Sequence, residues 1–398
     1  MVAMKKLRFI VLIILLSYGT LNADSFSLSL SQNMTSNLFQ NRYAEKDQLS
    51  DLSFYFDKNF GMLSFFAEGK YSYLFENSNL AYYIQDAGID YIVPLNEKSA
   101  FYFSLAGRGT FYRSDYADFN YLAANFFAAF KSYIDQTSIL KSNYALDYKK
   151  YRDSVYDFIS HSLMISFDKY FQSKTTLKGE ADWGYKYFFD PFVAEDIPVA
   201  ENPDGSMGPT STGHKGKGYT YGRNPYDPLD PSVRTDGQGI QVFSLSGLIA
   251  QGLGNNVGLR FTGMKQWVIS GQNPFFFIEE FYMVENPSYD RFSWEGYQIG
   301  SQLTFLMPWN IQLKLGYTVS QKEFPGIESL DLEGNPLGIT RKDERKQIDV
   351  RVEKNFARFS VFASYFYVDN GSNDLYFDWN GHFFTLGFEW NIPLGAKK

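Results

Sequence analysis

The chain has 398 residues, with 37 lysines and arginines against 44 aspartates and glutamates, and no cysteine. Aromatic residues make up 19% of it, although the mean hydropathy is only −0.29. This composition excludes disorder, collagen-like repeats and coiled coils. The lack of cysteine excludes a disulfide scaffold, a zinc–cysteine site and a thiol nucleophile. The acidic balance argues against a nucleic-acid-binding protein, which usually presents a basic face.

The first 23 residues have the layout of a secretory signal peptide. Lys5, Lys6 and Arg8 form a basic region, the apolar run 9–16 follows, and small or polar residues lead to Ala23. We therefore expect cleavage near Ala23 and export through the Sec pathway. A membrane anchor is the alternative, but this apolar run is too short to cross about 30 Å of hydrocarbon. No later segment approaches roughly 18 consecutive apolar residues, so no transmembrane helix is predicted.

From Ser25 onward the dominant period of the sequence is two. Apolar and polar residues alternate strictly over 25–31, 311–319 and 347–353. This alternation predicts β-strands with one face in each of two environments. Sixteen segments fit the pattern: 25–32, 49–57, 62–74, 81–93, 100–112, 120–132, 138–151, 157–169, 174–188, 239–250, 256–268, 292–306, 311–322, 345–354, 357–368 and 380–392.

The connections between these segments differ by parity. The connection after every even-numbered segment is short, whereas those after odd-numbered segments vary and include 189–238, 269–291 and 323–344. An antiparallel transmembrane β-barrel has this arrangement, with short periplasmic turns, long extracellular loops and both termini in the periplasm. We predict that residues 24–398 form one all-β, up-and-down barrel of about sixteen strands in the bacterial outer membrane. Fourteen or eighteen strands, and a secreted water-soluble β-barrel or sandwich, are the alternatives.

The apolar faces of the segments fit contact with lipid. The alternate positions of 122–130 are Leu, Ala and Phe, and Phe384, Leu386, Phe388 and Trp390 share one face near the end of the chain. Aromatic girdles at the two membrane interfaces account for the excess of Phe and Tyr. A sheet in lipid must also close on itself, because its backbone polar groups cannot stay unpaired there.

The last predicted strand resembles an assembly signal. Residues 385–392 contain Gly387, Trp390 and Ile392 at the spacing of the β-signal of outer-membrane proteins, although the chain continues for six residues beyond Ile392. The mature chain as a whole resembles a porin-type bacterial outer-membrane β-barrel protein. The resemblance implies insertion by the outer-membrane assembly machinery, contact with outer-membrane lipids and passive transport of small polar solutes.

The polar face carries charges of both signs in similar numbers. Their restriction to one parity is expected, because a charge on the lipid face costs roughly 2–4 kcal/mol near the midplane. Each of these residues could pair across strands, which is routine, or contact a solute in an aqueous channel. The predicted pore-lining residues are Glu68, Lys70, Asp86, Asp90, Arg108, Lys141, Asp147, Glu180, Asp182, Arg260, Lys314, Asp349, Arg351 and Arg358.

The connection 189–238 is the candidate for a constriction. It contains half of the fourteen prolines of the chain, and a connection of this length is usually functional or disordered. If it folds inward, its cations Lys215, Lys217 and Arg223 would face acidic wall residues such as Asp86 and Glu180. A loop on the outer surface is the alternative.

The sequence supports three functions unequally. We expect a pore for small hydrophilic solutes, with no catalytic residue, metal or cofactor. The alternative is a plugged surface barrel with a structural or adhesion role through its long loops, and a homo-oligomer is compatible with either. A lipid hydrolase comes third, because His161 and His382 lie on the predicted lipid face while Ser160 and Ser162 must point to the other face.

Overall fold

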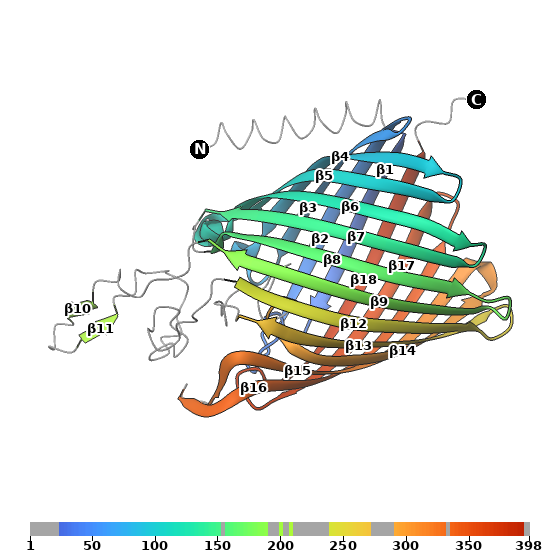
Figure 1. Ribbon diagram of the computed structural model, residues 1–398. Helices are drawn as coiled ribbons and strands as arrows, with labels where there is room; N and C mark the ends of the chain where they lie inside the picture. The colour runs from blue at the N-terminus through green and yellow to red at the C-terminus, as the bar shows by residue number, and fades with distance from the viewer. Residues whose placement is uncertain are drawn as a thin grey trace.

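The computed structural model describes residues 24–152, 156–189, 199–201, 207–209, 239–271, 290–331 and 335–393. Within these residues sixteen strands form one closed antiparallel barrel (Figure 1). Their bounds are β1 Ser25–Thr35, β2 Asp47–Phe60, β3 Leu63–Leu74, β4 Tyr82–Asn96, β5 Ser99–Tyr112, β6 Tyr121–Asp135, β7 Ser138–Tyr151, β8 Phe158–Tyr170, β9 Thr175–Phe188, β12 Gly239–Gly252, β13 Val257–Ser270, β14 Glu295–Met307, β15 Ile311–Leu330, β16 Pro336–Asn355, β17 Phe359–Ser372 and β18 Trp379–Pro393. The predicted fold class and strand count are confirmed.

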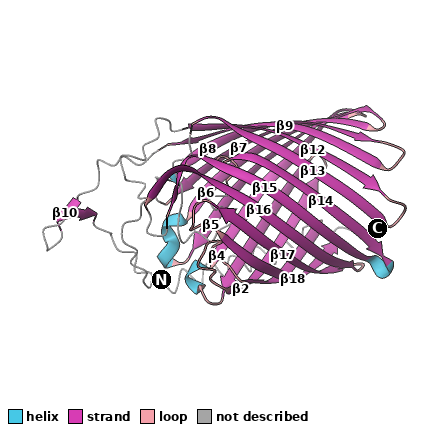
Figure 2. Ribbon diagram, turned by 90° about the horizontal axis from the view of Figure 1, so that it is seen from below, coloured by secondary structure: helices cyan, strands magenta, loops and turns pink. Residues whose placement is uncertain are grey.

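Closure is made by the two terminal strands. β1 pairs with β18 from Ser25 opposite Pro393 to Thr35 opposite Phe383, and on its other side β1 pairs with β2. Every barrel strand therefore has two neighbours, so the sheet has no open edge and its backbone groups are paired within the wall. Figure 2 shows the strands running obliquely across this wall, as closure of a barrel requires.

The two ends of the barrel differ as the parity of the connections predicted. At the short-turn end, on the right of Figure 1, strands are joined by 61–62, 97–98, 136–137, 171–174, 253–256, 308–310 and 356–358. The other connections meet at the opposite end, which we call the long-connection end. β10 Val199–Glu201 and β11 Met207–Pro209 pair with each other there, outside the barrel sheet. The predicted signal peptide lies outside the described residues.

One predicted connection is mostly strand. The segment 323–344 was expected to be a loop, but β15 continues to Leu330 and β16 begins at Pro336. The pairing continues past Glu323 opposite Lys342 through an irregularity to Glu328 opposite Thr340. The extension is stabilised by packing at the mouth, where Trp294, Phe324 and Ile327 form a buried cluster.

The outward face of the strands is an apolar band. Large side chains on it remain exposed, including Leu122 at 62%, Ile299 at 59% and Leu30 at 55%. Small buried clusters are found at the long-connection end instead of a central core; one of them joins Leu38, Leu49, Leu74 and Leu80. An exposed apolar surface of this extent marks an interaction with lipid or with another apolar surface.

A buried carboxylate fixes the connection between β3 and β4. Asp47 accepts hydrogen bonds from the backbone amides of Phe75, Glu76 and Asn77 at 3.1, 3.1 and 3.0 Å. The Phe75 amide also donates to the carbonyl oxygen of Gln48 at 3.0 Å, whereas the carboxylate is the acceptor that satisfies the amides of Glu76 and Asn77.

The helical segments are short 3-10 turns, namely η1 Ser78–Leu80, η2 Ser114–Phe119 and η7 Pro308–Asn310. η1 and η2 lie at the long-connection end, and η7 is one of the short turns. Among the described residues, no helix is long and apolar enough to cross a membrane.

Candidate functional site

The inner face of the barrel contains the predicted pore-lining residues, with one exception. On each strand these residues alternate with the exposed apolar residues of the outer band; Glu68, for example, lies opposite Tyr55 and Asp86, between the outward Ala67 and Gly69. Thirteen of the fourteen predicted residues have this inward parity.

The exception is Arg358. This residue lies exposed in the turn 356–358, because β17 begins only at Phe359, one residue later. The prediction that Arg358 lines the wall is wrong, since the sequence segment 357–368 placed the start of the strand too early.

On the β2–β5 side of the wall, two cations are bound to carboxylates. Lys70 forms an ion pair with Asp51 at 3.3 Å, and Arg108 makes two hydrogen bonds to Asp86, at 2.7 and 2.8 Å. The remaining two predicted carboxylates on this side, Glu68 and Asp90, form no ion pair with another described residue. This side of the wall therefore keeps a net negative charge.

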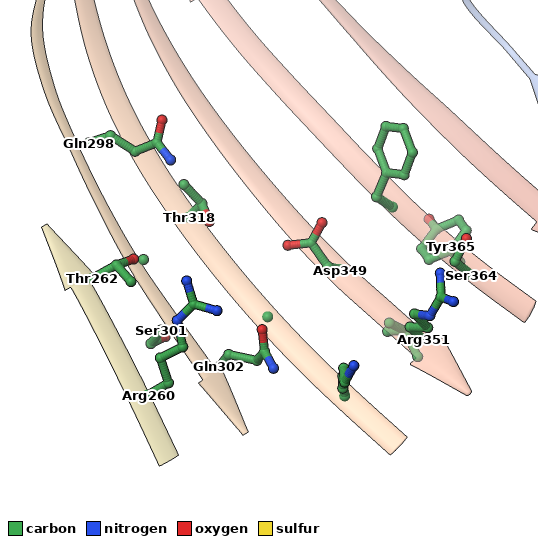
Figure 3. Close-up of a pocket in the computed structure, with 15 residues that line it drawn as sticks. Arg260, Thr262, Gln298, Ser301, Gln302, Thr318, Asp349, Arg351, Ser364 and Tyr365 are labelled. Atoms are coloured by element: carbon green, nitrogen blue, oxygen red, sulfur yellow. The ribbon is translucent and has the colours of Figure 1, made fainter. Parts of the chain in front are cut away.

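The opposite side, formed by β13–β17, contains a polar cavity of about 420 Å³ (Figure 3). Arg260, Gln302, Thr318 and Asp349 point into the space between these strands. Arg351 is paired with Glu353 at 2.9 Å. Within the described part of the chain, no ion pair is formed by Arg260 or Lys314, which also line the cavity. Asp349 also forms no ion pair with a described residue, so Arg260 and Lys314 together leave this side with a net positive charge.

The wall of β7–β9 is more fully paired. Lys141 binds Asp168, and Lys178 binds Glu180 at 2.6 Å. Asp182 forms an ion pair with Arg291, which lies in the connection before β14. The cations expected to face these carboxylates, Lys215, Lys217 and Arg223, lie outside the described residues.

The end of the connection before β14 folds onto the inner face, which the sequence reasoning missed. Asp290 pairs with Lys186 of β9, and Phe292 packs on Ile240 and Val242 of β12. Arg291 lies over Gly184, where a Cβ atom would be only 2.5 Å from its guanidinium nitrogen. The signal in the sequence was this inward glycine in the middle of a strand, because such a glycine often marks close approach of another group.

Aromatic side chains also face inward, although the sequence assigned the aromatic excess to the lipid interfaces. Tyr55 stacks on Phe66 at 6.5 Å between ring centroids, and Tyr102 meets Phe127 edge to face at 5.9 Å. The ring of Phe66 lies over Gly88, where a Cβ would be 2.6 Å from it. The inner wall beside Glu68 and Asp90 is therefore partly aromatic.

The predicted assembly signal lies on the closing strand. In β18, Trp390 and Ile392 have the outward parity, while Gly387 is on the inner face. A Cβ at Gly387 would lie 2.2 Å from the ring of Phe362. Gly387 is therefore needed for packing inside the barrel, and its role in assembly stays a prediction.

The two outward histidines bind tyrosines. Nδ1 of His161 lies 2.7 Å from the hydroxyl of Tyr144, and Nδ1 of His382 lies 2.8 Å from that of Tyr365. Ser160 has the inward parity, as expected. Among the described residues no group of His, Asp and Glu is arranged to hold a metal ion.

The similarity of this chain to known proteins lies at the level of structure. No protein-family model and no curated protein matches the chain. Solved structures similar to it include OpdO of Pseudomonas aeruginosa (9% identity over 94% of this chain and 99% of that one, TM-score 0.49). OccAB4 of Acinetobacter baumannii is 8% identical over 93% of this chain and 98% of that one, with a TM-score of 0.49. OccK8, also called OprE, of Pseudomonas aeruginosa is 9% identical over 93% of this chain and 98% of that one, with a TM-score of 0.44. At these identities the likeness concerns the fold alone. The class of this chain, a porin-type β-barrel, is defined by its own closed sixteen-stranded sheet.

Proposed function

We propose that this protein is a bacterial outer-membrane pore for the passive diffusion of small hydrophilic solutes. The apolar outer band and the polar inner wall support a position across a membrane, because only a closed sheet satisfies its backbone in lipid. The parity of the connections supports an orientation with the short turns and both termini in the periplasm.

The observation that carries the proposal is the separation of unpaired charges across the lumen. In the closed strand order β3 and β13 are eight positions apart in either direction, as are β5 and β15. Glu68 of β3 therefore lies across the barrel from Arg260 of β13, and the neighbouring Asp90 and Lys314 have the same signs as these two residues. Opposite charges facing each other across water set up a transverse field, which favours polar solutes over apolar ones.

The test is a planar-bilayer measurement on the refolded mature chain. The wild type should conduct, with weak selectivity between cations and anions. Arg260→Glu combined with Lys314→Glu should shift the reversal potential in a salt gradient toward cation selectivity. The control exchanges the paired residues, Lys178→Glu combined with Glu180→Lys, so that the pair keeps its net charge and the reversal potential should not move. Absence of any conductance in folded, inserted protein would contradict the proposal.

A plugged barrel is the second candidate, and one observation favours it. The segment 290–294 is held against the inner face of the barrel by the ion pairs of Asp290 with Lys186 and of Arg291 with Asp182. If this segment is part of a plug, the wild type will not conduct, whereas Arg291→Ala will open a measurable current.

A further inference from the structure

An apolar groove of about 680 Å³ lies on the outer face at the short-turn end of β16, β17 and β18. Its aromatic floor is continuous: Phe356 stacks on Phe359 at 4.3 Å, and Phe359 meets Phe388 at 5.4 Å. Trp390 completes it. Phe356 and Trp390 remain 43% and 42% exposed, so the structure leaves this floor uncovered.

Two cations border the groove. Arg358 is one of its lining residues and is exposed, and the Lys354 ammonium lies 4.9 Å from the centroid of Phe356. Neither side chain forms an ion pair with another described residue. By contrast, Lys58 and Lys169 at the same end of the barrel are paired with Asp24 and Asp135. Positive charge at this groove is therefore left without a carboxylate.

The order of these groups along the wall matches an amphipathic ligand. Arg358 lies in the turn, Phe359 is opposite Trp390 at the start of the strand, and Phe388 lies farther into the apolar band, opposite Val361. A ligand with its anionic group at the turn would thus lay its apolar part along the band. Lysine and arginine side chains at a membrane interface extend their charged ends toward head groups in this way.

We infer that this groove binds one anionic phospholipid. Its phosphodiester is held by Arg358 and Lys354, and an acyl chain lies on Phe356, Phe359 and Phe388. Charge complementarity and continuity with the apolar band select this occupant over a second copy of the chain, since basic pockets at a membrane surface bind anionic head groups. The inference rests on the proposed position in the membrane, and it does not require the pore to be open.

Native mass spectrometry of the refolded full chain tests the inference. Phosphatidylglycerol should be retained as a single adduct in preference to phosphatidylcholine with the same acyl chains, and glycerol phosphate should not displace it. Lys354→Gln combined with Arg358→Gln should lower the affinity by a factor on the order of 10 to 30. Phe356→Ser should weaken retention of both lipids. Lys98→Gln combined with Lys174→Gln removes two cations from other short turns and should have no effect.

Several results would overturn the lipid site. These are equal retention of both lipids, the same loss in the control variant, displacement by glycerol phosphate, or a lipid-free dimer that the Lys354 and Arg358 changes dissolve. Heat-modifiable migration in gels verifies that every variant is folded. A chain that binds phosphatidylglycerol but never conducts would contradict the pore alone, whereas a conducting chain without lipid preference would contradict this inference alone.

Discussion

The buried pair of Arg341 and Asp343 should control the stability of the extended β15–β16 hairpin. Arg341 is 1% exposed and Asp343 is 4% exposed, and two hydrogen bonds of 3.0 and 2.6 Å join them. The guanidinium carbon of Arg341 lies 4.2 Å from the ring centroid of Phe324 and 3.3 Å from that of Phe377. Arg341→Met keeps most of this volume but removes both hydrogen bonds of the guanidinium, leaving the buried Asp343 carboxylate with a hydrogen bond from Ser372 and with Lys322 opposite it on β15. Loss of one partner of a buried pair costs about 3–5 kcal/mol.

Hydrogen exchange of the backbone amides in 324–343 measures this cost directly. Arg341→Met should speed exchange by about two to four orders of magnitude, the factor that about 3–5 kcal/mol corresponds to. Adding Asp343→Leu should restore most of the protection, because apolar replacement of both partners is often neutral. Amides of β6 and β7 should not change in any variant. If the double variant exchanges as fast as Arg341→Met, the effect is explained by the lost packing of the arginine and not by a buried carboxylate without its partner.

Three further predictions concern single side chains. Asp47→Ala should lower the free energy of unfolding by about 2–4 kcal/mol, measured in urea in lipid vesicles, because it removes the carboxylate acceptor of the Glu76 and Asn77 amides; Asp47→Asn, which keeps one acceptor, should cost less. Asp135 is the last residue of β6, and hydrogen bonds, first of all from the amide of Thr137 in the adjoining short turn, hold its pKa below the ordinary 3.8, so the carboxylate stabilises the fold at neutral pH. Asp135→Asn should therefore be less stable than wild type at pH 7, with a difference that shrinks as the pH falls below about 4. A constant difference would contradict the assignment. Arg291→Ala should raise single-channel conductance, because it releases the inward segment from Asp182, and an unchanged conductance would place that segment outside the current path.

The strands could be predicted because each one separates two environments. A residue such as Leu122 contacts the apolar side and its neighbour Ala123 the other, so the pattern has period two along the whole strand. The closed order followed from the short turns, which force sequential strands to be neighbours. The ends of strands were less predictable, since the environment no longer alternates there: β15 and β16 run past the apolar band, and Arg358 falls in a turn.

Contacts between distant segments could not be predicted from a local period. The ion pairs of Asp290 with Lys186 and of Arg291 with Asp182 join positions about a hundred residues apart in sequence. The one indication in the sequence was Gly184, because the absence of a side chain there leaves room for Arg291. The inward aromatic residues were missed for a similar reason: Phe66 occupies the space above Gly88 on the next strand, so its inward position depends on a partner that its own strand does not contain.

Composition and strand parity predict which charged residues line the inside of the barrel, but they do not predict the electric field across it. Positive and negative residues are about equally frequent on the inner face, which by itself predicts no separation of charge across the lumen. The structure distributes them unequally, because Lys70 and Arg108 are bound to carboxylates on one side while Arg260 and Lys314 on the other form no ion pair with a described residue. A permeating solute would meet the charges that remain after pairing, and these are negative near β3 and β4 and positive near β13 and β15. Selectivity should therefore respond strongly to Arg260 and Lys314 and weakly to the paired residues, although all of them lie on the same face.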